Sequence, residues 1–199
     1  MKSLAWYCFA VGFLCLVSGE TQTCQGAFDS TFLFVDTVDT GVSSKFAFKN
    51  NNTSEGTVFF STARRSDGLP CIRMRFDSKR LPLVSIRGGI FSKKELIREP
   101  VEYPNRRNVG KVLAKRGLPA NTVLTELSLH ICHNEILTDD AGCCDGSPLY
   151  WIAHAMLRRE DGKTVRAEVT TAGDGCELRT AAGPDIVVCR LDVECMSAE

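Results

Sequence analysis

The cysteines constrain this chain more than any other residue type. The chain has 199 residues and ten cysteines. Six of them lie in its last third, at Cys132, Cys143, Cys144, Cys176, Cys189 and Cys195. A β-domain of about 80 residues buries too little apolar surface to be stable by packing alone, and disulfides supply the missing stability. The cluster therefore predicts a small β-fold that disulfide bonds hold together.

The first 19 residues have the pattern of a secretory signal peptide. Lys2 supplies the positive start, residues 4–17 are uncharged and largely apolar, and Val17-Ser18-Gly19 offers small residues for cleavage. A membrane anchor needs about 20 apolar residues, and no second stretch of that length follows. We therefore expect a secreted, extracellular protein without a membrane span, in a compartment where cysteines pair.

Removal of residues 1–19 leaves eight cysteines, an even number that can pair completely. The predicted disulfide cysteines are Cys24, Cys71 and the six of the last third. A bond between Cys24 and Cys71 would tie the N-terminus to a middle strand. Cys143 and Cys144 are adjacent and cannot easily bond each other without strain. They must reach two different partners, or one of them must bridge to another chain.

Charge divides the mature sequence into two regions. Residues 20–116 contain 17 lysines and arginines against 10 aspartates and glutamates, whereas residues 117–199 contain 6 against 14. Gly117-Leu118-Pro119 follows the change in composition. We expect a basic, β-rich N-terminal region of residues 20–116 and an acidic, cysteine-rich β-domain of residues 117–199. The alternative is one domain with a basic and an acidic face.

Short runs with alternating apolar residues, separated by turn residues such as Arg87-Gly88-Gly89, predict antiparallel strands. The runs are residues 31–38, 45–49, 57–62, 72–76, 81–86, 122–131, 149–157, 164–170 and 186–195. One short helix is expected within residues 92–116. The expected fold is mainly β, with disulfide-stabilised antiparallel sheets as in a β-sandwich. Residues 117–199 are expected to form a meander of four to five strands.

Two segments near the C-terminus resemble secreted cystine-knot cytokines. Gly142-Cys143-Cys144-Asp145 looks like the Gly-Cys-Cys-Asn element of the platelet-derived growth factor group. Residues 147–160 are similar to the interleukin-17 strand that runs from a Ser-x-Pro element to Leu-Arg-Arg. The resemblance implies a cystine-knot-like fold. It also implies a homodimeric signalling ligand, or an antagonist of one, that binds a cell-surface receptor and is not an enzyme.

Two surface sites are predicted from local sequence. Overlapping sequons predict N-glycosylation at Asn51 or Asn52. A basic segment predicts binding of a sulfated glycosaminoglycan such as heparan sulfate, and a solvated basic face is the alternative. The residues of this segment are Arg106, Arg107, Lys111, Lys115 and Arg116, and Arg107, Lys111 and Lys115 would share one helix face.

The sequence leaves two other function classes open. One is a different secreted β-sandwich binding protein with a role in defence, in the matrix or in modulating a host. The other is a dimeric aspartic protease, because Asp39-Thr40-Gly41 looks like the catalytic element and a second copy would supply the second carboxylate. His130, Cys132 and His133 cluster, but secreted cysteines pair as disulfides. We therefore expect no metal, no cofactor and no nucleic-acid partner.

Overall fold

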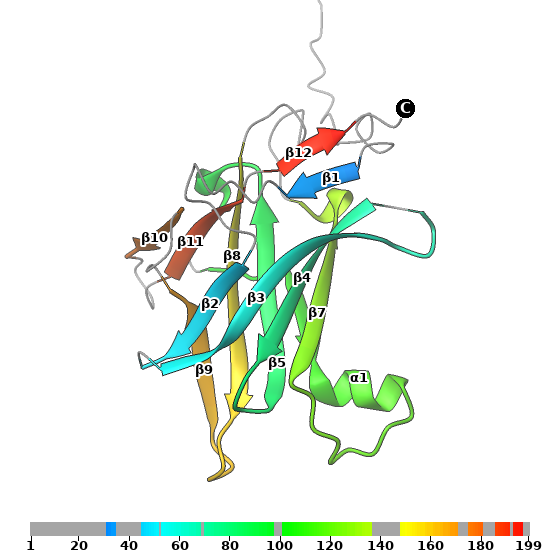
Figure 1. The fold of residues 1–199 in the computed structure, drawn as a ribbon, viewed down its shortest axis with the longest axis vertical. Helices are drawn as coiled ribbons and strands as arrows, with labels where there is room; N and C mark the ends of the chain where they lie inside the picture. The colour runs from blue at the N-terminus through cyan, green and yellow to red at the C-terminus, as the bar shows by residue number, and fades with distance from the viewer. Residues whose placement is uncertain are drawn as a thin grey trace, which may run out of the picture.

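Antiparallel β-strands make up most of the chain, as the sequence predicts. A computed structural model describes residues 31–34, 45–51, 53–68, 70–97, 101–136, 148–170, 175–180, 186–191 and 193–196 (Figure 1). The strands are β1 (Thr31–Phe34), β2 (Lys45–Asn50), β3 (Thr53–Arg64), β4 (Pro70–Ser78), β5 (Leu83–Phe91), β6 (Asn105–Asn108), β7 (Glu126–Cys132), β8 (Leu149–Arg158), β9 (Thr164–Val169), β10 (Cys176–Arg179), β11 (Ile186–Leu191) and β12 (Val193–Met196). The predicted mainly β fold with antiparallel sheets is confirmed.

The expected helix is the α-helix α1 (Val109–Lys115), and 3₁₀-helices form at η2 (Lys94–Leu96) and η3 (His133–Glu135). At the start of α1, the Asn108 side-chain oxygen accepts a hydrogen bond from the Lys111 backbone N–H at 3.3 Å. Gly117 follows its end with a φ of 64°, in the left-handed region that glycine adopts without strain. Arg107 precedes the helix on β6, so the predicted helix face shared by Arg107, Lys111 and Lys115 is wrong.

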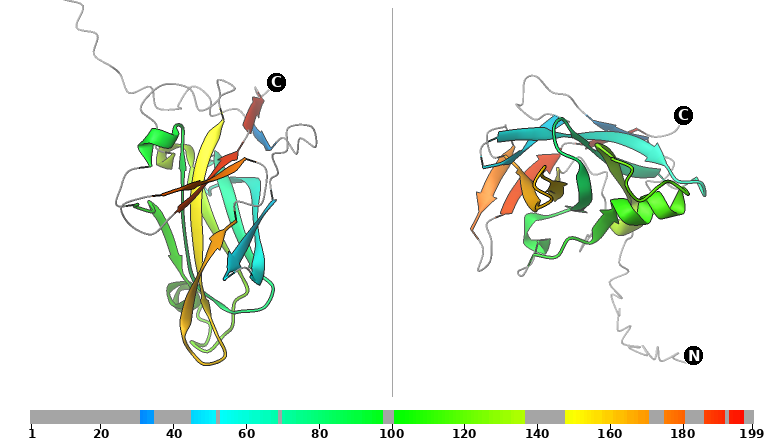
Figure 2. Two further views of the ribbon diagram at one scale, coloured as in Figure 1. Left: turned by 90° about the vertical axis from the view of Figure 1, so that its left-hand side faces the viewer. Right: turned by 90° about the horizontal axis from the view of Figure 1, so that it is seen from below.

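The main sheet is curled. Its described strands pair in the order β10-β11-β8-β9-β2-β3-β4-β7, and β5 pairs with both β8 and β6. The curl brings β6 beside β7, where the Arg107 Nη1 donates a hydrogen bond of 2.7 Å to the Ser128 carbonyl. The view from below in Figure 2 shows the strands curving around a common centre. In a separate two-stranded sheet, β1 pairs with β12.

Strands from the basic and acidic regions pair with each other in this one sheet. β2 pairs with β9, β4 with β7, and β5 with β8. The predicted meander of residues 117–199 is therefore wrong: β7 pairs with β4 and does not join β8. The inner side chains of both regions belong to one apolar cluster, and burial in that cluster favours pairing across the two regions. The boundary predicted at Gly117 lies between α1 and β7, inside this arrangement.

Trp151 lies at the centre of the core. It is fully buried on β8, with its ring centroid 4.7 Å from that of Phe46 and 4.8 Å from that of Phe60. Alternation explains the inner face of β8, because Leu149, Trp151, Ala153, Ala155 and Leu157 all point inward and are all buried. Aromatic rings at these distances and at steep angles to one another contribute beyond their buried area.

A second apolar cluster lies on the outer face of the sheet. Ile152 on β8 packs there with Phe91 and Ile97, and Tyr103 is packed against the cluster. Pro104, which precedes β6, lies close over the sheet at Gly89, where an added Cβ would lie 2.7 Å from the Pro104 Cδ. Gly88 and Gly89 were expected in a turn but lie inside β5. This close approach explains why glycine occupies position 89.

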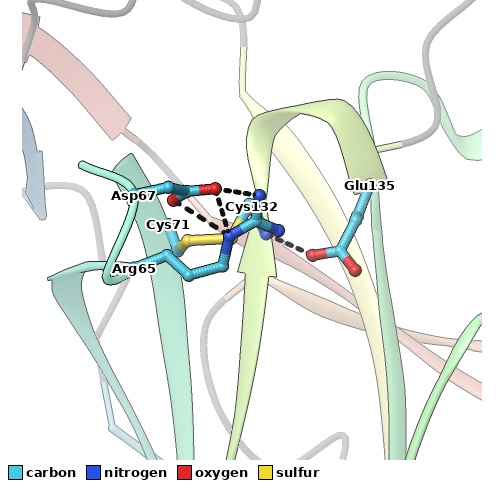
Figure 3. Close-up of polar contacts among 5 residues, drawn as sticks. All are labelled: Arg65, Asp67, Cys71, Cys132 and Glu135. Atoms are coloured by element: carbon cyan, nitrogen blue, oxygen red, sulfur yellow. Dashed lines mark hydrogen bonds and ion pairs between the residues drawn. A yellow bond between two sulfur atoms is a disulfide. The ribbon is translucent and has the colours of Figure 1, made fainter. Parts of the chain in front are cut away.

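Two disulfides occur within the described residues. Cys71 on β4 lies opposite Cys132 on β7 and is bonded to it (Figure 3). Cys176 and Cys189 likewise face each other across β10 and β11 and are bonded. The suggested pairing of Cys24 with Cys71 is therefore wrong, because strand register brings Cys132 to Cys71. Cys24, Cys143, Cys144 and the side chain of Cys195 lie outside the described residues.

The turn and the 3₁₀-helix beside the Cys71–Cys132 bond are held by side-chain contacts, all drawn in Figure 3. After β3, the exposed Arg65 guanidinium pairs with the Asp67 carboxylate through hydrogen bonds of 2.9 and 3.0 Å from its Nε. At η3, the Cys132 backbone N–H donates to the Glu135 carboxylate at 2.8 Å. These contacts order the chain on both sides of the disulfide.

Candidate anion-binding site

The structure separates the basic residues that the sequence groups together. Arg106 and Arg107 are neighbours on β6, and neighbouring residues of a strand point to opposite faces. Arg107 lies opposite the buried Ile86, whereas Arg106 lies opposite Arg87 on the outer face. Lys111 and Lys115 belong to α1, and Arg116 follows it. Arg106 therefore lies beside Arg87, which is outside the basic segment that the sequence predicts as a binding site.

A row of polar side chains crosses the outer face of the sheet. Its members lie opposite one another in register, one on each of five neighbouring strands. We call it the charged row, and it consists of Lys49 on β2, Glu168 on β9, His154 on β8, Arg87 on β5 and Arg106 on β6. Residues opposite each other in a sheet share a face and are close enough to interact. With strands about 4.8 Å apart, the row is about 19 Å long.

His154 is the buried centre of the row. Only 5% of the residue is exposed, because the Tyr103 ring lies across it with the ring centroids 4.5 Å apart and the planes at 83°. Its Nδ1 atom is buried and has no hydrogen-bond partner among the described residues. A buried nitrogen without a partner is costly.

Arg166 flanks the row on β9, two residues before Glu168. Its Nε lies 2.6 Å from a Glu168 carboxylate oxygen, and its Nη2 donates to the Tyr103 hydroxyl at 3.1 Å. Glu168 is therefore already neutralised by Arg166. Within the described part of the chain, Arg87 and Arg106 have no acidic partner, and the buried Nε of Arg87 has no acceptor.

The electrostatics of the site favour an anion. Burial, together with Arg166, Arg87 and Arg106, lowers the pKa of His154 to about 3, so the imidazole is neutral at physiological pH. Burial raises the pKa of Tyr103, which stays uncharged as well. The row and Arg166 then contain four cations and one carboxylate, a net charge of +3. Arginine binds carboxylate, sulfate and phosphate groups through paired N–H donors.

We expect His154 to make the protein less stable in acid. Its pKa is 6.5 in an unfolded chain and about 3 in the folded one, so unfolding takes up a proton and the free energy of unfolding falls below pH 6.5. Between about pH 7.5 and pH 5 this residue alone should remove about 2 kcal/mol. Urea denaturation of the wild type and of His154→Gln across this range measures the effect.

Other groups titrate in the same range, so the relevant quantity is the difference in unfolding free energy between the two proteins at each pH. As the pH falls, the wild type should lose more unfolding free energy than the His154→Gln variant does. A difference that stays constant from neutral pH to pH 5 would show that His154 is not held neutral by its surroundings.

The structure also places some of the other sites that the sequence predicts. Asn51 is exposed in the turn between β2 and β3, with a φ of 45°, and is accessible to a glycan. Asn52 and Asp39 lie outside the described residues. The sulfur of Cys132 is bonded to Cys71 and is not a metal ligand. In the described ranges no three His, Cys, Asp or Glu residues are grouped to hold a metal ion.

Comparisons with protein-family models, with curated proteins and with solved structures each found no match for this chain. The helices of the described residues are all too short or too polar to cross a membrane. The sequence did contain a signal for the charged row: polar residues alternate with apolar ones in residues 164–170, and His154 interrupts an apolar run. Strand register brings these residues together, and their spacing along the chain does not reveal it.

Proposed function

We propose that this chain is a secreted, disulfide-stabilised glycoprotein that acts by binding, and that the charged row binds a sulfated glycosaminoglycan. The row itself is the main support. Arg87 and Arg106 lie side by side and have no acidic partner among the residues that the structure describes, and Lys49 places a further cation at the other end of the row. A linear polyanion with repeated sulfate groups fits a row about 19 Å long that has cations at both ends better than a compact anion does.

The cysteines and the sequon support the extracellular part of the proposal. Disulfides persist in oxidising compartments and are rare in the cytosol, and two are present in the described residues. Residues 1–19 have the composition of a signal peptide. Asn51, in its sequon, is exposed at the tip of a hairpin. All three features are expected of a glycoprotein that passes through the secretory pathway.

The described disulfides do not favour a cystine-knot ligand. A knot needs interlocked bonds among the C-terminal cysteines. Cys132 instead bonds to Cys71 in the N-terminal region, and Cys176 bonds to Cys189 within a single hairpin. Binding through the outer face of the curled sheet does not depend on a knot, so the proposal rests on the charged row.

The test is binding to immobilised heparin and, by isothermal titration, to a heparin oligosaccharide. Arg87→Gln combined with Arg106→Gln should weaken binding at least about tenfold, because each substitution removes charged hydrogen-bond donors. It should also lower the salt concentration that elutes the protein, since ion pairing with sulfate is screened by salt. Both side chains are at least partly exposed, so the fold should tolerate the change.

Lys111→Gln combined with Lys115→Gln is the matched control. It removes the same charge from exposed positions on α1 and should change the affinity less than about threefold. If the α1 variant loses as much affinity as the sheet variant, binding depends on net charge and the row is not the site. Unchanged binding to desulfated heparin would also contradict the proposal.

A further inference from the structure

A polar cavity of about 540 Å³ lies where three connections of the sheet meet. The β2–β3 hairpin, the β4–β5 turn and the β8–β9 hairpin each contribute to its lining. Its charged lining residues are Glu55, Arg80, Arg159, Glu160 and Asp161. The volume is within the usual range of sites for small molecules, about 300–1,000 Å³. The charged row and the predicted functions do not account for this cavity.

Glu55 is the extra residue of a β-bulge. Phe48 on β2 lies opposite Gly56 on β3, but the next residue, Lys49, lies opposite Ser54. Glu55 therefore has no counterpart on β2. A bulge of this kind bends the strand and turns the extra side chain in a new direction, and bulges are frequent beside functional sites. The Glu55 carbonyl still accepts a hydrogen bond of 2.8 Å from the Lys79 backbone N–H.

Gly56 makes this bulge possible. A Cβ added at position 56 would lie 2.2 Å from the Asp77 carbonyl oxygen and 2.4 Å from the Phe48 Cζ. Both distances are far shorter than any real contact, and one of the two atoms is backbone that cannot move away easily. The chain therefore approaches β4 and the Phe48 ring closely only with glycine here. The direction of Glu55 is set by the backbone of the sheet.

One oxygen of the Glu55 carboxylate is buried and has no hydrogen-bond partner in the described part of the chain. Only 7% of the residue is exposed, although it lines the cavity. Its Oε2 atom accepts no hydrogen bond from any described residue. Arg80 and Arg159 line the same cavity but are exposed and form no ion pair with it within the described chain. Burying a carboxylate oxygen without a donor is unfavourable, so a bound group that donates to it would be strongly favoured.

We propose that this cavity binds a small organic cation, whose guanidinium or ammonium group donates to the Glu55 carboxylate. Glu160 and Asp161 add negative charge to the lining, and Arg80 and Arg159 of the same lining can hold an anionic group of the ligand. A basic amino acid carries both kinds of charge. This ligand class is distinct from the polyanion of the charged row, and the two sites can be tested separately.

The experiment uses L-arginine and its decarboxylated analogue agmatine in isothermal titration with the full-length secreted protein. Both should bind with saturation at submillimolar to millimolar concentrations. L-citrulline, in which a neutral urea replaces the guanidinium, should bind at least about tenfold more weakly than L-arginine because it lacks the charge-assisted hydrogen bond. Equal binding of citrulline and arginine, or no saturable binding of either cationic probe, would overturn the proposal.

Glu55→Gln keeps the shape of the side chain and should weaken L-arginine binding at least about tenfold. Glu102→Gln, at an exposed carboxylate outside the cavity lining, is the matched control and should change the affinity less than about threefold. If Glu55→Gln does not fold, the melting temperature of the wild type tests the proposal instead. L-arginine should raise this temperature and citrulline should not. Unchanged affinity in a folded Glu55→Gln protein would disprove the role of Glu55.

Discussion

Replacing Trp151 with alanine is expected to lower the free energy of unfolding by about 3–5 kcal/mol, which is the usual cost of truncating a buried aromatic side chain. Trp151 is fully buried, and the rings of Phe46 and Phe60 pack against it at steep angles. Both phenylalanines are on strands of the N-terminal region, whereas Trp151 is on a C-terminal one. The substitution would leave a cavity where the two regions meet. Urea denaturation followed by circular dichroism measures the loss.

Val123→Ala is the control for this experiment. Val123 is 62% exposed, so its truncation should change the free energy of unfolding by less than about 0.5 kcal/mol. The loss of unfolding free energy for Trp151→Phe should lie between the losses for Trp151→Ala and Val123→Ala, because phenylalanine keeps an aromatic ring at this position. A cost of less than about 1 kcal/mol for Trp151→Ala would be too small for a residue in a shared core, and it would indicate that the two regions are stabilised separately.

Individual strands could be predicted from the sequence because alternation is a local property. Phe46 and Phe48 are two apart in residues 45–49, and both point into the core from β2. The same period predicts β9 almost to the residue, and the apolar run of residues 149–157 predicts β8. β2 and β9 have one face on the core, so their pattern of apolar residues records which side is buried, whereas β8 is buried on both faces.

The pairing of strands could not be predicted in the same way. Gly88-Gly89 has the composition of a turn, yet the pair lies within β5 because Pro104 and the inner side chains of β4 and β7 come close to it. The bulge at Glu55 depends on the register between β2 and β3, and Gly56 beside it is compatible with a bulge but does not fix that register. Both features result from packing between segments that are distant in the sequence.

The candidate anion-binding site could be predicted from the sequence only in part, for the same reason. Arg106 belongs to a basic segment that is visible in the sequence, but its neighbours in space are Arg87 and His154. The charged row runs from Lys49 on β2 to Arg106 on β6 and draws on five strands. The row therefore depends on the same long-range pairing that joins the basic and acidic regions. A substitution that breaks this pairing should impair the fold and the site together.

Removing the Cys71–Cys132 disulfide should directly weaken this long-range pairing. The bond closes a loop with a sequence separation of 61 residues and joins β4 to β7. In the chain-entropy model a loop of this size is worth about 4 kcal/mol, because the bond restricts the unfolded chain. Cys71→Ala combined with Cys132→Ala should therefore lower the free energy of unfolding by about that amount. Denaturation of the variant and of the oxidised wild type measures it.

The Cys176–Cys189 disulfide is the matched comparison. Its cysteines are only 13 residues apart in one hairpin, so Cys176→Ala combined with Cys189→Ala should cost about 3 kcal/mol. The longer loop should thus account for about 1 kcal/mol more, provided that both bonds act on the unfolded chain. A larger stability cost for removing Cys176–Cys189 than for removing Cys71–Cys132 would show that Cys71 and Cys132 contribute little to joining the regions. In that case the shared core around Trp151 would hold them together without the covalent bond.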